Sequence, residues 1–208
     1  MATIPVQVGL PAGHYNRAAE VLTLAFQEDP VACYVLPEAT RRRRVLRRMF
    51  RAYLRYGQRH GVISTTPDVE GVAIWLAPGQ TTPTLGRLLG SGACLIPLYS
   101  GWKALRRSLA FMEMTTAWHQ RYVPEVHWYL LYLGVTPDRQ GQGIGSALLQ
   151  PILARAETEA LPCYLETGTA RNVGFYERHG FQVLAEGALA HGGPRLWSML
   201  RRPAALQA

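Results

Sequence analysis

An almost unbroken run of apolar and aromatic residues, His127–Val135, leads directly into a glycine-rich segment, and this succession constrains the fold more than any other part of the sequence. A strand without polar residues at alternate positions is covered on both faces, so it lies near the middle of a sheet. Thr136-Pro137-Asp138 ends the run, and Ile144–Glu159 then places apolar residues on one side of a helix. The sequence from 127 to 159 therefore predicts a central strand, a tight loop and a helix.

Strands and helices alternate along the rest of the chain. The expected elements are an extended start at Ile4–Leu10, helices at Tyr15–Gln27 and Glu38–His60, strands at Val62–Thr65 and Val69–Leu76, a helix at Trp102–Gln120, a strand at Cys163–Thr167, a helix at Asn172–His179, and strands at Phe181–Ala185 and Pro194–Leu200. Gly61 is the expected stop of the second helix, and the stretch from Pro78 to Gly101 is expected to be loop and broken helix. This succession predicts an α/β or α+β fold of three layers built on a mixed sheet.

Length and composition bound the organisation of the chain. Its 208 residues, 48% hydrophobic and 17% charged, suffice for one sizeable core, and we expect a single domain over 1–208. The first residues lack a basic segment followed by an apolar one, and no stretch approaches the roughly 20 apolar residues of a membrane helix. These features predict a cytoplasmic protein without a membrane partner.

Cysteines and histidines give no sign of a disulfide framework or a metal site. The three cysteines, Cys33, Cys94 and Cys163, are odd in number and form no CxxC pair. The six histidines show no HExxH or other metal-ligand spacing. We expect reduced, structural cysteines and no metal.

Arginine supplies almost all of the formal net charge of +8, because Lys103 is the only lysine. Nine arginines fall between Arg41 and Arg59, where apolar residues recur at helical spacing, so this segment predicts an amphipathic helix with a basic face. Three interpretations stay open: a solvated face, attraction of an anionic cofactor or substrate, and nucleic-acid binding. Nucleic acid is the least favoured, because the aromatic residues lie on the presumed core side and not among the arginines.

The loop Gln140-Gly141-Gln142-Gly143-Ile144-Gly145-Ser146 carries the clearest chemical signal. Its place between a buried strand and a helix directs backbone N–H groups and a helix N-terminus at one point, which makes an anion site. Side chains at Gly143 or Gly145 would hold phosphate oxygens away from these N–H groups. A pyrophosphate is the natural ligand of such a loop.

Other phosphate loops compete for this segment. A P-loop is excluded because no lysine follows the last glycine. Gly141, Gly143 and Ser146 approximate a dinucleotide motif, and Glu166 ends the next strand about 20 residues further on, where a ribose-binding acid would lie. The short remainder of the chain counts against a doubly wound sheet, yet a small NAD(P)-binding oxidoreductase and a purely structural turn stay open.

Two segments together resemble the GNAT superfamily of acetyltransferases. The acetyl-CoA motif of that family, [Q/R]-x-x-G-x-[G/A], is matched by Gln140, Gly143 and Gly145. Its second segment is matched, in the same order, by Leu165-Glu166-Thr167, Arg171-Asn172, Phe175-Tyr176-Glu177-Arg178 and Gly180-Phe181. The resemblance is close from about His127 to Arg201, nearest to the branch containing puromycin N-acetyltransferase, and weak upstream of His127.

This resemblance implies a fold and a set of site residues. The fold is a three-layer α/β/α domain whose central, mostly antiparallel sheet of six to seven strands is splayed at the cofactor. The residues implied to bind acetyl-CoA are Leu133, Val135, Gln140, Gly141, Gly143, Gly145, Ser146 and Asn172. Backbone groups of Leu133 and Val135 would pair with the pantetheine arm where neighbouring strands diverge at Gly134, and an N–H near Leu133 would polarise the thioester carbonyl.

The resemblance also assigns a general acid. Tyr176 matches the residue that protonates the departing CoA thiolate, and we expect it to face away from the core while its neighbour Phe175 faces inward. The alternatives are a buried aromatic at Tyr176 and an ordinary helix N-cap at Asn172. Arg139, beside the loop, is a candidate for the 3′-phosphate of CoA.

The general base stays open at this point. His127, Glu113, His119, Glu28, Asp29 or a water chain could accept the proton that an ammonium acceptor must lose before its nitrogen attacks. Glu28 and Asp29 could equally recognise a cationic amine, or only cap and solvate a helix end. No residue type or spacing decides among them.

We therefore expect an acetyl-CoA-dependent N-acetyltransferase that acts on the primary amine of a small molecule by direct attack in a ternary complex. The first half, about 1–125, would build the acceptor site, and about 126–205 would bind acetyl-CoA. No cysteine occupies a matched catalytic position, so no acyl-enzyme is expected. A non-catalytic acyl-CoA-binding protein is a further alternative, and a homodimer is possible.

Overall fold

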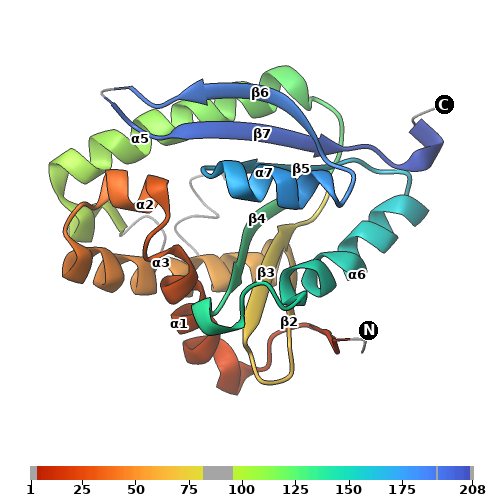
Figure 1. The fold of residues 1–208 in the computed structure, drawn as a ribbon, viewed down its shortest axis with the longest axis horizontal. Coiled ribbons are helices and arrows are strands. Elements are labelled where there is room, and N and C mark those ends of the chain that lie inside the picture. The colour runs from red at the N-terminus through yellow and green to blue at the C-terminus, as the bar shows by residue number, and fades with distance from the viewer. Residues whose placement is uncertain (1–3, 82–95, 191, 207–208) are drawn as a thin grey trace.

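A computed structural model describes residues 4–81, 96–190 and 192–206, which form a seven-stranded sheet flanked by helices (Figure 1). The strand order is β1-β2-β3-β4-β5-β7-β6, and only the β4–β5 pair is parallel. The strands are β1 Gln7–Val8, β2 Gly61–Thr65, β3 Gly71–Leu76, β4 Trp128–Val135, β5 Cys163–Thr167, β6 Gln182–Ala188 and β7 Arg195–Arg201. The expected mixed, mostly antiparallel sheet is confirmed, with the apolar strand β4 at its centre.

Helices cover both faces of the sheet and complete the three layers. They are α1 Tyr15–Phe26, α2 Pro30–Val35, α3 Ala39–His60, α5 Ile96–Tyr122, α6 Ile144–Thr158 and α7 Ala170–Glu177. The first face is covered by α1 and α3, together with α5, which contacts α2, α3 and β7. The opposite face is covered by α6 and α7 (Figure 1). The β4–β5 gap therefore has one group of helices on each side.

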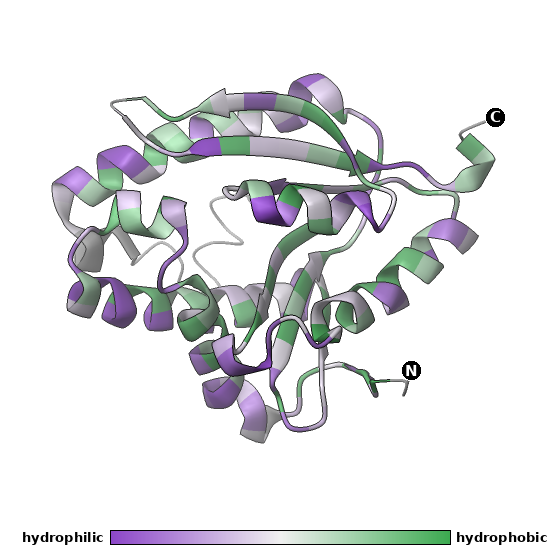
Figure 2. Ribbon diagram, viewed as in Figure 1, coloured by the Kyte–Doolittle hydropathy of each residue, from purple (hydrophilic) through white to green (hydrophobic). Residues whose placement is uncertain are grey.

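Each face of the sheet has its own apolar core. Leu148, Leu149 and Ile152 of α6 pack with buried residues of β4 and β5, whereas Leu22 and Phe50 belong to the core under α1 and α3. Colouring by hydropathy shows β3 and β4 green or pale, whereas much of α3 is purple (Figure 2). The sheet is therefore covered on both faces, as the run at 127–135 predicted.

One short helix was not expected from the sequence, and one expected helix end has an unexpected backbone conformation. The segment Glu28-Asp29-Pro30 does follow the end of α1, but it also begins α2, which the sequence reading missed. Asp29 is the N-cap and Pro30 the first residue of this helix, where proline is well tolerated because its missing N–H has no intrahelical partner. Gly61 does end α3, but with an extended φ of −167°. Glycine is needed there because a Cβ would overlap the carbonyl oxygen of Trp75.

The sheet opens between its only parallel strands. Pairing of β4 with β5 runs from Trp128 opposite Cys163 to Leu130 opposite Leu165 and then stops. On the other edge of β4, Trp75 pairs with Leu130 and Ile74 with Tyr132, so Leu131 is the extra residue of a β-bulge. The divergence expected at Gly134 thus begins earlier, directly after Leu130. A bulge bends its strand, which explains why the two strands part here.

Gly134 has another role in this opening. A Cβ at that position would lie 2.9 Å from Leu22 Cδ2 and 3.0 Å from Ala25 Cβ, both on α1. These separations are shorter than ordinary carbon–carbon contacts of about 3.5–4.0 Å. The absence of a side chain therefore allows α1 to pack directly against the part of β4 that has left β5.

The basic side of α3 faces solvent for much of its length, as expected of a solvated face. Arg43 and Arg47 are about half exposed and share the carboxylate of Glu20, at 2.8 and 3.5 Å. Arg51 donates to Asn16. One arginine of the run departs from this pattern, because the side chain of Arg42 is only 5% exposed.

Some sequence expectations concern residues outside the described ranges. Cys94 and most of the expected loop between Pro78 and Gly101 belong to this group, whereas Cys33 and Cys163 are free thiols. Gly101 interrupts α5 with a φ of 73°, so a regular helix starts only after it, close to the expected start at Trp102. Within the described residues, no helix is both long and apolar enough to cross a membrane.

Candidate functional site

The edge of β4 that faces β5 is left without a strand partner beyond Leu130. Its other edge remains bonded to β3, with Ala73 opposite Leu133 and Gly71 opposite Val135. Buried or half-buried N–H and C=O groups need partners, so an unpaired strand edge is suited to a ligand that carries amide groups. The predicted residues Leu133 and Val135 both lie in the part of β4 that β5 leaves without a partner.

The loop after β4 ends at the N-terminus of α6. Gly143 is the N-cap residue with a φ of 86°, and Gly141 has a φ of 78°, conformations that strongly favour glycine. The first intrahelical bond runs from Ala147 N–H to the Gly143 carbonyl. The N–H groups of Ile144, Gly145 and Ser146 precede it, so they have no acceptor within the helix and point towards the loop. This arrangement can bind a pyrophosphate.

Two glutamines fix the loop against the strand end. The Gln140 amide donates to the Val135 carbonyl over 3.1 Å, and the Gln142 amide donates to the Asp138 carbonyl over 3.2 Å. Both side chains therefore tie the loop to the chain just before it. Gln140, which matches the first position of the acetyl-CoA motif, links the end of β4 to the phosphate loop.

The first turn of α6 also contacts α7. A Cβ on Gly145 would meet the ring of Phe175 at 3.4 Å, and Ser146 Oγ lies 3.0 Å from His179 Nε2. Glycine at 145 therefore keeps α7 close to the phosphate loop as well as leaving the backbone accessible. The two segments that carry the sequence motifs meet at this point.

Asn172 does not cap α7. Thr169 is the N-cap residue and Asn172 lies in the first helical turn, so the alternative interpretation of Asn172 as an ordinary N-cap is wrong. Its amide nitrogen donates to Thr167 Oγ1 over 3.2 Å, at the end of β5. The side chain is therefore held beside the β4–β5 opening.

Tyr176 is more buried than the sequence suggested. Only 7% of the residue is exposed, and it belongs to the core on the α6 side, so the expected outward orientation is wrong. Its ring contacts Phe175 and Phe181 edge to face. Burial raises its pKa, which keeps the phenol protonated. Among the described residues, no hydrogen-bond partner of its hydroxyl is found, so the proton is available to a ligand.

Glu166 lies on β5 one residue beyond the last pair with β4. Cys163 and Leu165 point to the α6 core, so strand alternation turns Glu166 to the opposite face. Tyr129 Oη donates to Glu166 Oε2 over 2.7 Å. Burial nevertheless raises the pKa of Glu166 to about 7, so the carboxyl can both accept and release a proton near neutral pH.

Asp29 approaches the same opening from the loop between α1 and α2. Its Oδ1 accepts from the N–H groups of Val31 and Ala32 at 2.9 and 3.1 Å. Its Oδ2 would lie 3.9 Å from a Cβ placed on Gly168, two residues after Glu166. Burial raises the pKa of Asp29, although both backbone N–H groups lower it. The second oxygen is thus directed to the end of β5.

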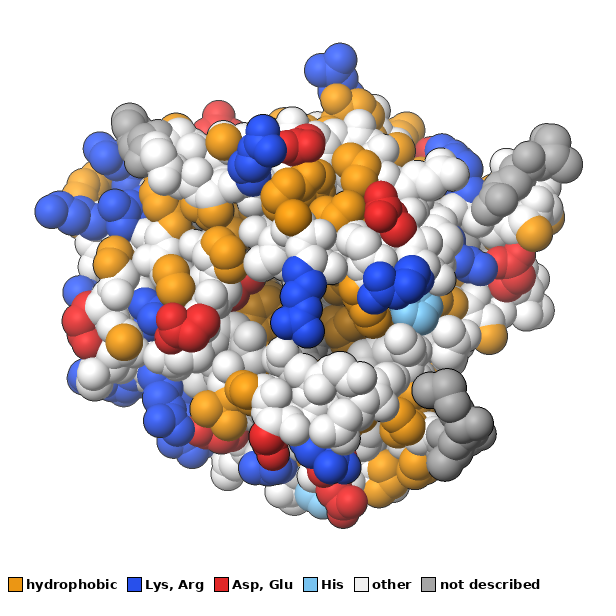
Figure 3. All heavy atoms as spheres, viewed as in Figure 1, with side chains coloured by type: hydrophobic (Ala, Val, Ile, Leu, Met, Phe, Trp, Pro, Cys, Tyr) orange, Lys and Arg blue, Asp and Glu red, His pale blue; other side chains and the backbone are white. Residues whose placement is uncertain are grey.

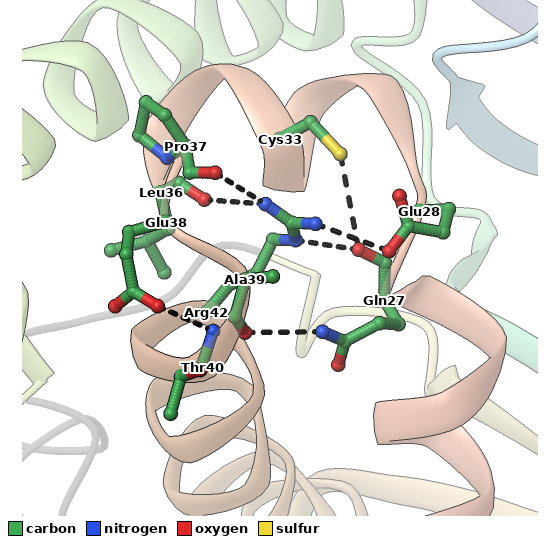
Figure 4. A network of polar contacts seen from close by, with 9 residues as sticks. All are labelled: Gln27, Glu28, Cys33, Leu36, Pro37, Glu38, Ala39, Thr40 and Arg42. Carbon is green, nitrogen blue, oxygen red and sulfur yellow. Dashed lines mark hydrogen bonds and ion pairs between the residues drawn. The ribbon is translucent and has the colours of Figure 1, made fainter.

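Arg42 braces the loop that carries Asp29 (Figure 4). Its guanidinium donates to the carbonyls of Gln27, Leu36 and Pro37 at 2.6, 2.9 and 3.0 Å. It also pairs with the exposed carboxylate of Glu28 at 3.1 Å. Glu28 is therefore engaged with Arg42, which leaves Asp29 as the acidic residue of this loop that faces the opening.

Aromatic rings line the face of β4 that packs against α1 and α3. Tyr132 is in ring contact with Phe26, Phe50 and Tyr53, with centroids 5.1–5.6 Å apart. Burial raises the pKa of Tyr132 well above its usual value, and both Asp29 and Glu166 contribute to the rise. The two carboxylates therefore act on the same phenol. The surface is hollowed near the centre of the view, with a largely apolar floor (Figure 3).

The two histidines considered as bases form a neutral pair. His127 Nδ1 lies 2.6 Å from the Glu125 carbonyl, which can only accept, so Nδ1 carries the proton and Nε2 accepts from His119 Nε2 at 2.6 Å. Burial and His127 lower the pKa of His119 to about 4, and burial lowers that of His127. The lone pair of His127 is thus already used within the pair.

Glu113, another candidate base, lies on the exposed side of α5. Arg139, the candidate for the 3′-phosphate of CoA, pairs with Glu70 at 2.9 Å, and its side chain is 44% exposed. The assignment of Arg139 to the 3′-phosphate stays a prediction.

The sheet does not fit the alternative of a dinucleotide-binding fold. A dinucleotide fold needs a parallel, doubly wound sheet, whereas six pairs in this sheet include five antiparallel ones. Glu166, the candidate ribose acid, is turned towards Tyr129. The structure thus brings together the strand edge, the loop, Asn172 and Tyr176, and adds Glu166, which was not among the candidate bases expected from the sequence.

Sequence and structure comparisons agree with this geometry. The family described as Acetyltransferase (GNAT) domain matches residues 103–183. An uncharacterised N-acetyltransferase of Schizosaccharomyces pombe, C550.08, is 29% identical over 177 residues, covering 82% of this chain and 71% of that protein. A Corynebacterium glutamicum structure, described as histone acetyltransferase HPA2 and related acetyltransferase, has a TM-score of 0.65 at 24% identity, covering 96% of this chain and 97% of that one. Arylalkylamine N-acetyltransferase 2 from Aedes aegypti has a TM-score of 0.58 at 13% identity, covering 95% and 98%.

The matched region begins in α5 and ends in β6, so it includes β4, the loop, α6, β5 and α7. The two solved structures share the fold over nearly the whole chain. The nearer resemblance to the puromycin N-acetyltransferase branch stays a prediction. The family match over residues 103–183, the curated relative and the shared fold all support the resemblance of this chain to the GNAT superfamily of acetyltransferases.

Proposed function

We propose that this enzyme transfers the acetyl group of acetyl-CoA to the primary amine of a small molecule, with Glu166 as general base and Tyr176 as general acid. The observation that carries the proposal is the position of Glu166, a carboxyl with a pKa of about 7 at the point where β5 loses its partner β4. Tyr176 belongs to the core on the other face of the sheet. Acid and base would thus meet the reacting atoms from opposite sides of one gap.

The residues present fit acetyl-CoA. Two pantetheine amides would bond to the backbone groups of Leu133 and Val135 on the strand edge that β5 leaves, and the pyrophosphate would take the N–H groups at the start of α6. The positive-φ glycines Gly141 and Gly143 allow this loop conformation without strain. Asn172 would hydrogen-bond the arm as it enters the gap.

The proton balance assigns a separate role to each residue. The acceptor ammonium gives one proton to the Glu166 carboxylate, its nitrogen bonds to the acetyl carbon, and the carbon–sulfur bond breaks. The departing sulfur takes the phenol proton of Tyr176. The second proton of the bonded nitrogen then restores the Tyr176 phenol, which leaves a neutral amide, and Glu166 releases its proton to water. A phenol with a pKa of ~10 is a weaker acid than a thiol with a pKa of ~8.5, so proton transfer from Tyr176 to the CoA thiolate is unfavourable in water. The apolar surroundings that raise the pKa of the phenol disfavour the charged thiolate as well, and therefore raise the pKa of the thiol too.

Direct attack is favoured over an acyl-enzyme. Burial raises the pKa of the Cys163 thiol to about 12, and burial also raises that of Cys33. Reactive cysteines require a lowered pKa, because the thiolate is the nucleophile. The acetyl group therefore passes straight to the amine within a ternary complex.

The acceptor side supports a small cationic amine. Asp29 Oδ2 is directed at Gly168, two residues after Glu166, so a group held by Asp29 lies close to the base. The rings around Tyr132 offer faces to which a cation is attracted. Asp29 would attract the ammonium and Glu166 would deprotonate it.

A thiol-release assay with acetyl-CoA tests this proposal. The panel contains aminoglycosides, aminonucleosides, polyamines, amino acids and short peptides, and the expected result is amine-dependent thiol release with at least one small amine. Turnover restricted to peptides or protein N-termini would reject the small-molecule acceptor. Thiol release at the same rate for Glu166→Gln would reject the assigned base.

A further inference from the structure

One face of α5 exposes large apolar side chains to solvent. Trp102, Leu109 and Met112 are 76%, 54% and 46% exposed, and Leu105 is partly buried between them. These four residues recur at intervals of three, four and three. The spacing is that of the a and d positions of a heptad, so they line a single stripe along the helix after Gly101.

The opposite side of α5 is occupied by the enzyme itself. Ala104 and Thr115 are buried, and Met114 and Trp118 lie against Gly187 of β6, where a Cβ would be 2.6 and 3.0 Å from their side chains. The exposed stripe is therefore not the core-facing side. Isolated surface hydrophobics are common, but a continuous stripe of this kind marks an interaction site.

Charges beside the stripe indicate what binds there. With Trp102 at position a, both Arg106 and Glu113 fall at position e, and both are exposed. Neither side chain has an ion-pair partner among residues 4–81, 96–190 and 192–206. In an antiparallel helix pair, position e of one helix faces position e of the other. The chain thus carries both halves of a complementary pair.

An antiparallel alignment of two copies satisfies both observations at once. Opposing Leu109 with Met112 of the second copy also opposes Arg106 with Glu113 of the second copy, within one helical turn. Twofold symmetry repeats each contact, so two apolar layers and two ion pairs form together. A parallel, in-register alignment would instead place Glu113 near Ser108 and Arg106 near Gly101, neither of which offers a charge.

We propose that a second copy of this chain docks antiparallel on this stripe of α5, with Leu109 and Met112 at its centre, forming a twofold dimer. The proposal is independent of acetyl transfer, because none of these residues lies in the gap between β4 and β5. It assigns a surface and an orientation to the homodimer that the sequence left merely possible.

Charge exchange between Arg106 and Glu113 tests the orientation. Sedimentation of the full chain should show a dimer at about 100 µM, a concentration at which a Kd near 10 µM is readily detected. Arg106→Glu and Glu113→Arg should each raise the dimer Kd at least about tenfold, because each places like charges together twice. The double variant R106E/E113R should return the Kd to near the parent value. A monomeric parent, or a double variant as weak as the singles, overturns the proposal.

A second variant tests the apolar stripe. L109Q/M112Q should be monomeric while its circular dichroism and thermal unfolding stay close to those of the parent, because both side chains are exposed. Val126→Gln is the matched control, since Val126 is 57% exposed but lies outside α5. Dimerisation unaffected by L109Q/M112Q, or lost equally in Val126→Gln, would assign the interface elsewhere.

Discussion

The two sides of the β4–β5 gap are built in different ways. On the proposed acetyl-CoA side, the contacts would be backbone groups of one short segment, from Leu133 to Ser146, whose conformation is set by glycines and a helix start. On the proposed acceptor side, side chains come from distant segments, with Asp29 before α2, Tyr132 in β4 and Glu166 in β5. The first side suits a constant ligand, and the second can change its ligand through single substitutions.

Loss of the phenol should have the largest effect on turnover. Tyr176→Phe removes the proposed acid from the acetyl-CoA side, and we expect kcat to fall roughly 10²-fold or more with little change in acetyl-CoA affinity. The measurement is steady-state thiol release together with binding of CoA. Tyr122→Phe, which removes a phenol oxygen from α5, should leave kcat unchanged. A near-parental kcat for Tyr176→Phe would reject its role as acid.

The contrast between the two sides also explains what the sequence could predict. Gln140–Ser146 is contiguous, and the strand and helix around it have strong hydrophobic patterns, so the loop, β4 and α6 were placed correctly. The mostly antiparallel sheet followed from family resemblance. The position of the opening did not, because the bulge at Leu131 depends on pairing with β3 and leaves no mark in the sequence.

The residues of the proposed acceptor side could be predicted from the sequence only in part. Pro30 follows the expected end of the first helix at Gln27, and a proline there is compatible both with a helix end and with the first position of a new helix, so α2 was not expected. Arg42 is one of nine neighbouring arginines, and only tertiary packing distinguishes it as the buried brace of the Asp29 loop. Glu166 was noticed for its family segment, but its pKa depends on burial beside Tyr129, which cannot be read from the sequence.

A substitution at Asp29 should separate the two sides. Asp29→Asn keeps a good N-cap for α2 but removes the negative charge, so the KM for the amine should rise roughly tenfold while that for acetyl-CoA stays constant. Glu28→Gln is the matched control and should change the amine KM much less, because Glu28 pairs with Arg42. Equal effects of both variants would contradict a specific role for Asp29.

A substitution at Gly143 should act on the other side alone. Gly143→Ala forces a side chain into a left-handed conformation at a cost of about 1–2 kcal/mol, so the loop shifts and acetyl-CoA affinity should fall about fivefold. Gly79→Ala introduces the same strain at a φ of 76°, with open space around it and away from the loop. Calorimetry should find weaker CoA binding only for Gly143→Ala. An equal loss in both variants would point to general destabilisation.

Glu166 should also have a small effect on the free energy of unfolding, and this effect should depend on pH. Its pKa is raised from 4.5 to about 7 by burial, so its contribution to stability is complete below the unfolded pKa and is lost as pH rises through the folded one. Glu166→Gln should therefore be more stable than the parent at about pH 8, by at most about 3 kcal/mol, and closer to it at about pH 5. Thermal unfolding at both pH values measures this difference.

The pH dependence of kcat/KM for the amine tests the central claim most directly. If Glu166 is the base, kcat/KM of the parent enzyme rises with pH and levels off above a pKa of about 7, and Glu166→Gln loses this limb together with roughly 10²-fold in rate. A Glu166→Gln enzyme that keeps the same limb at about pH 7 would contradict the account, because another group would then be accepting the proton.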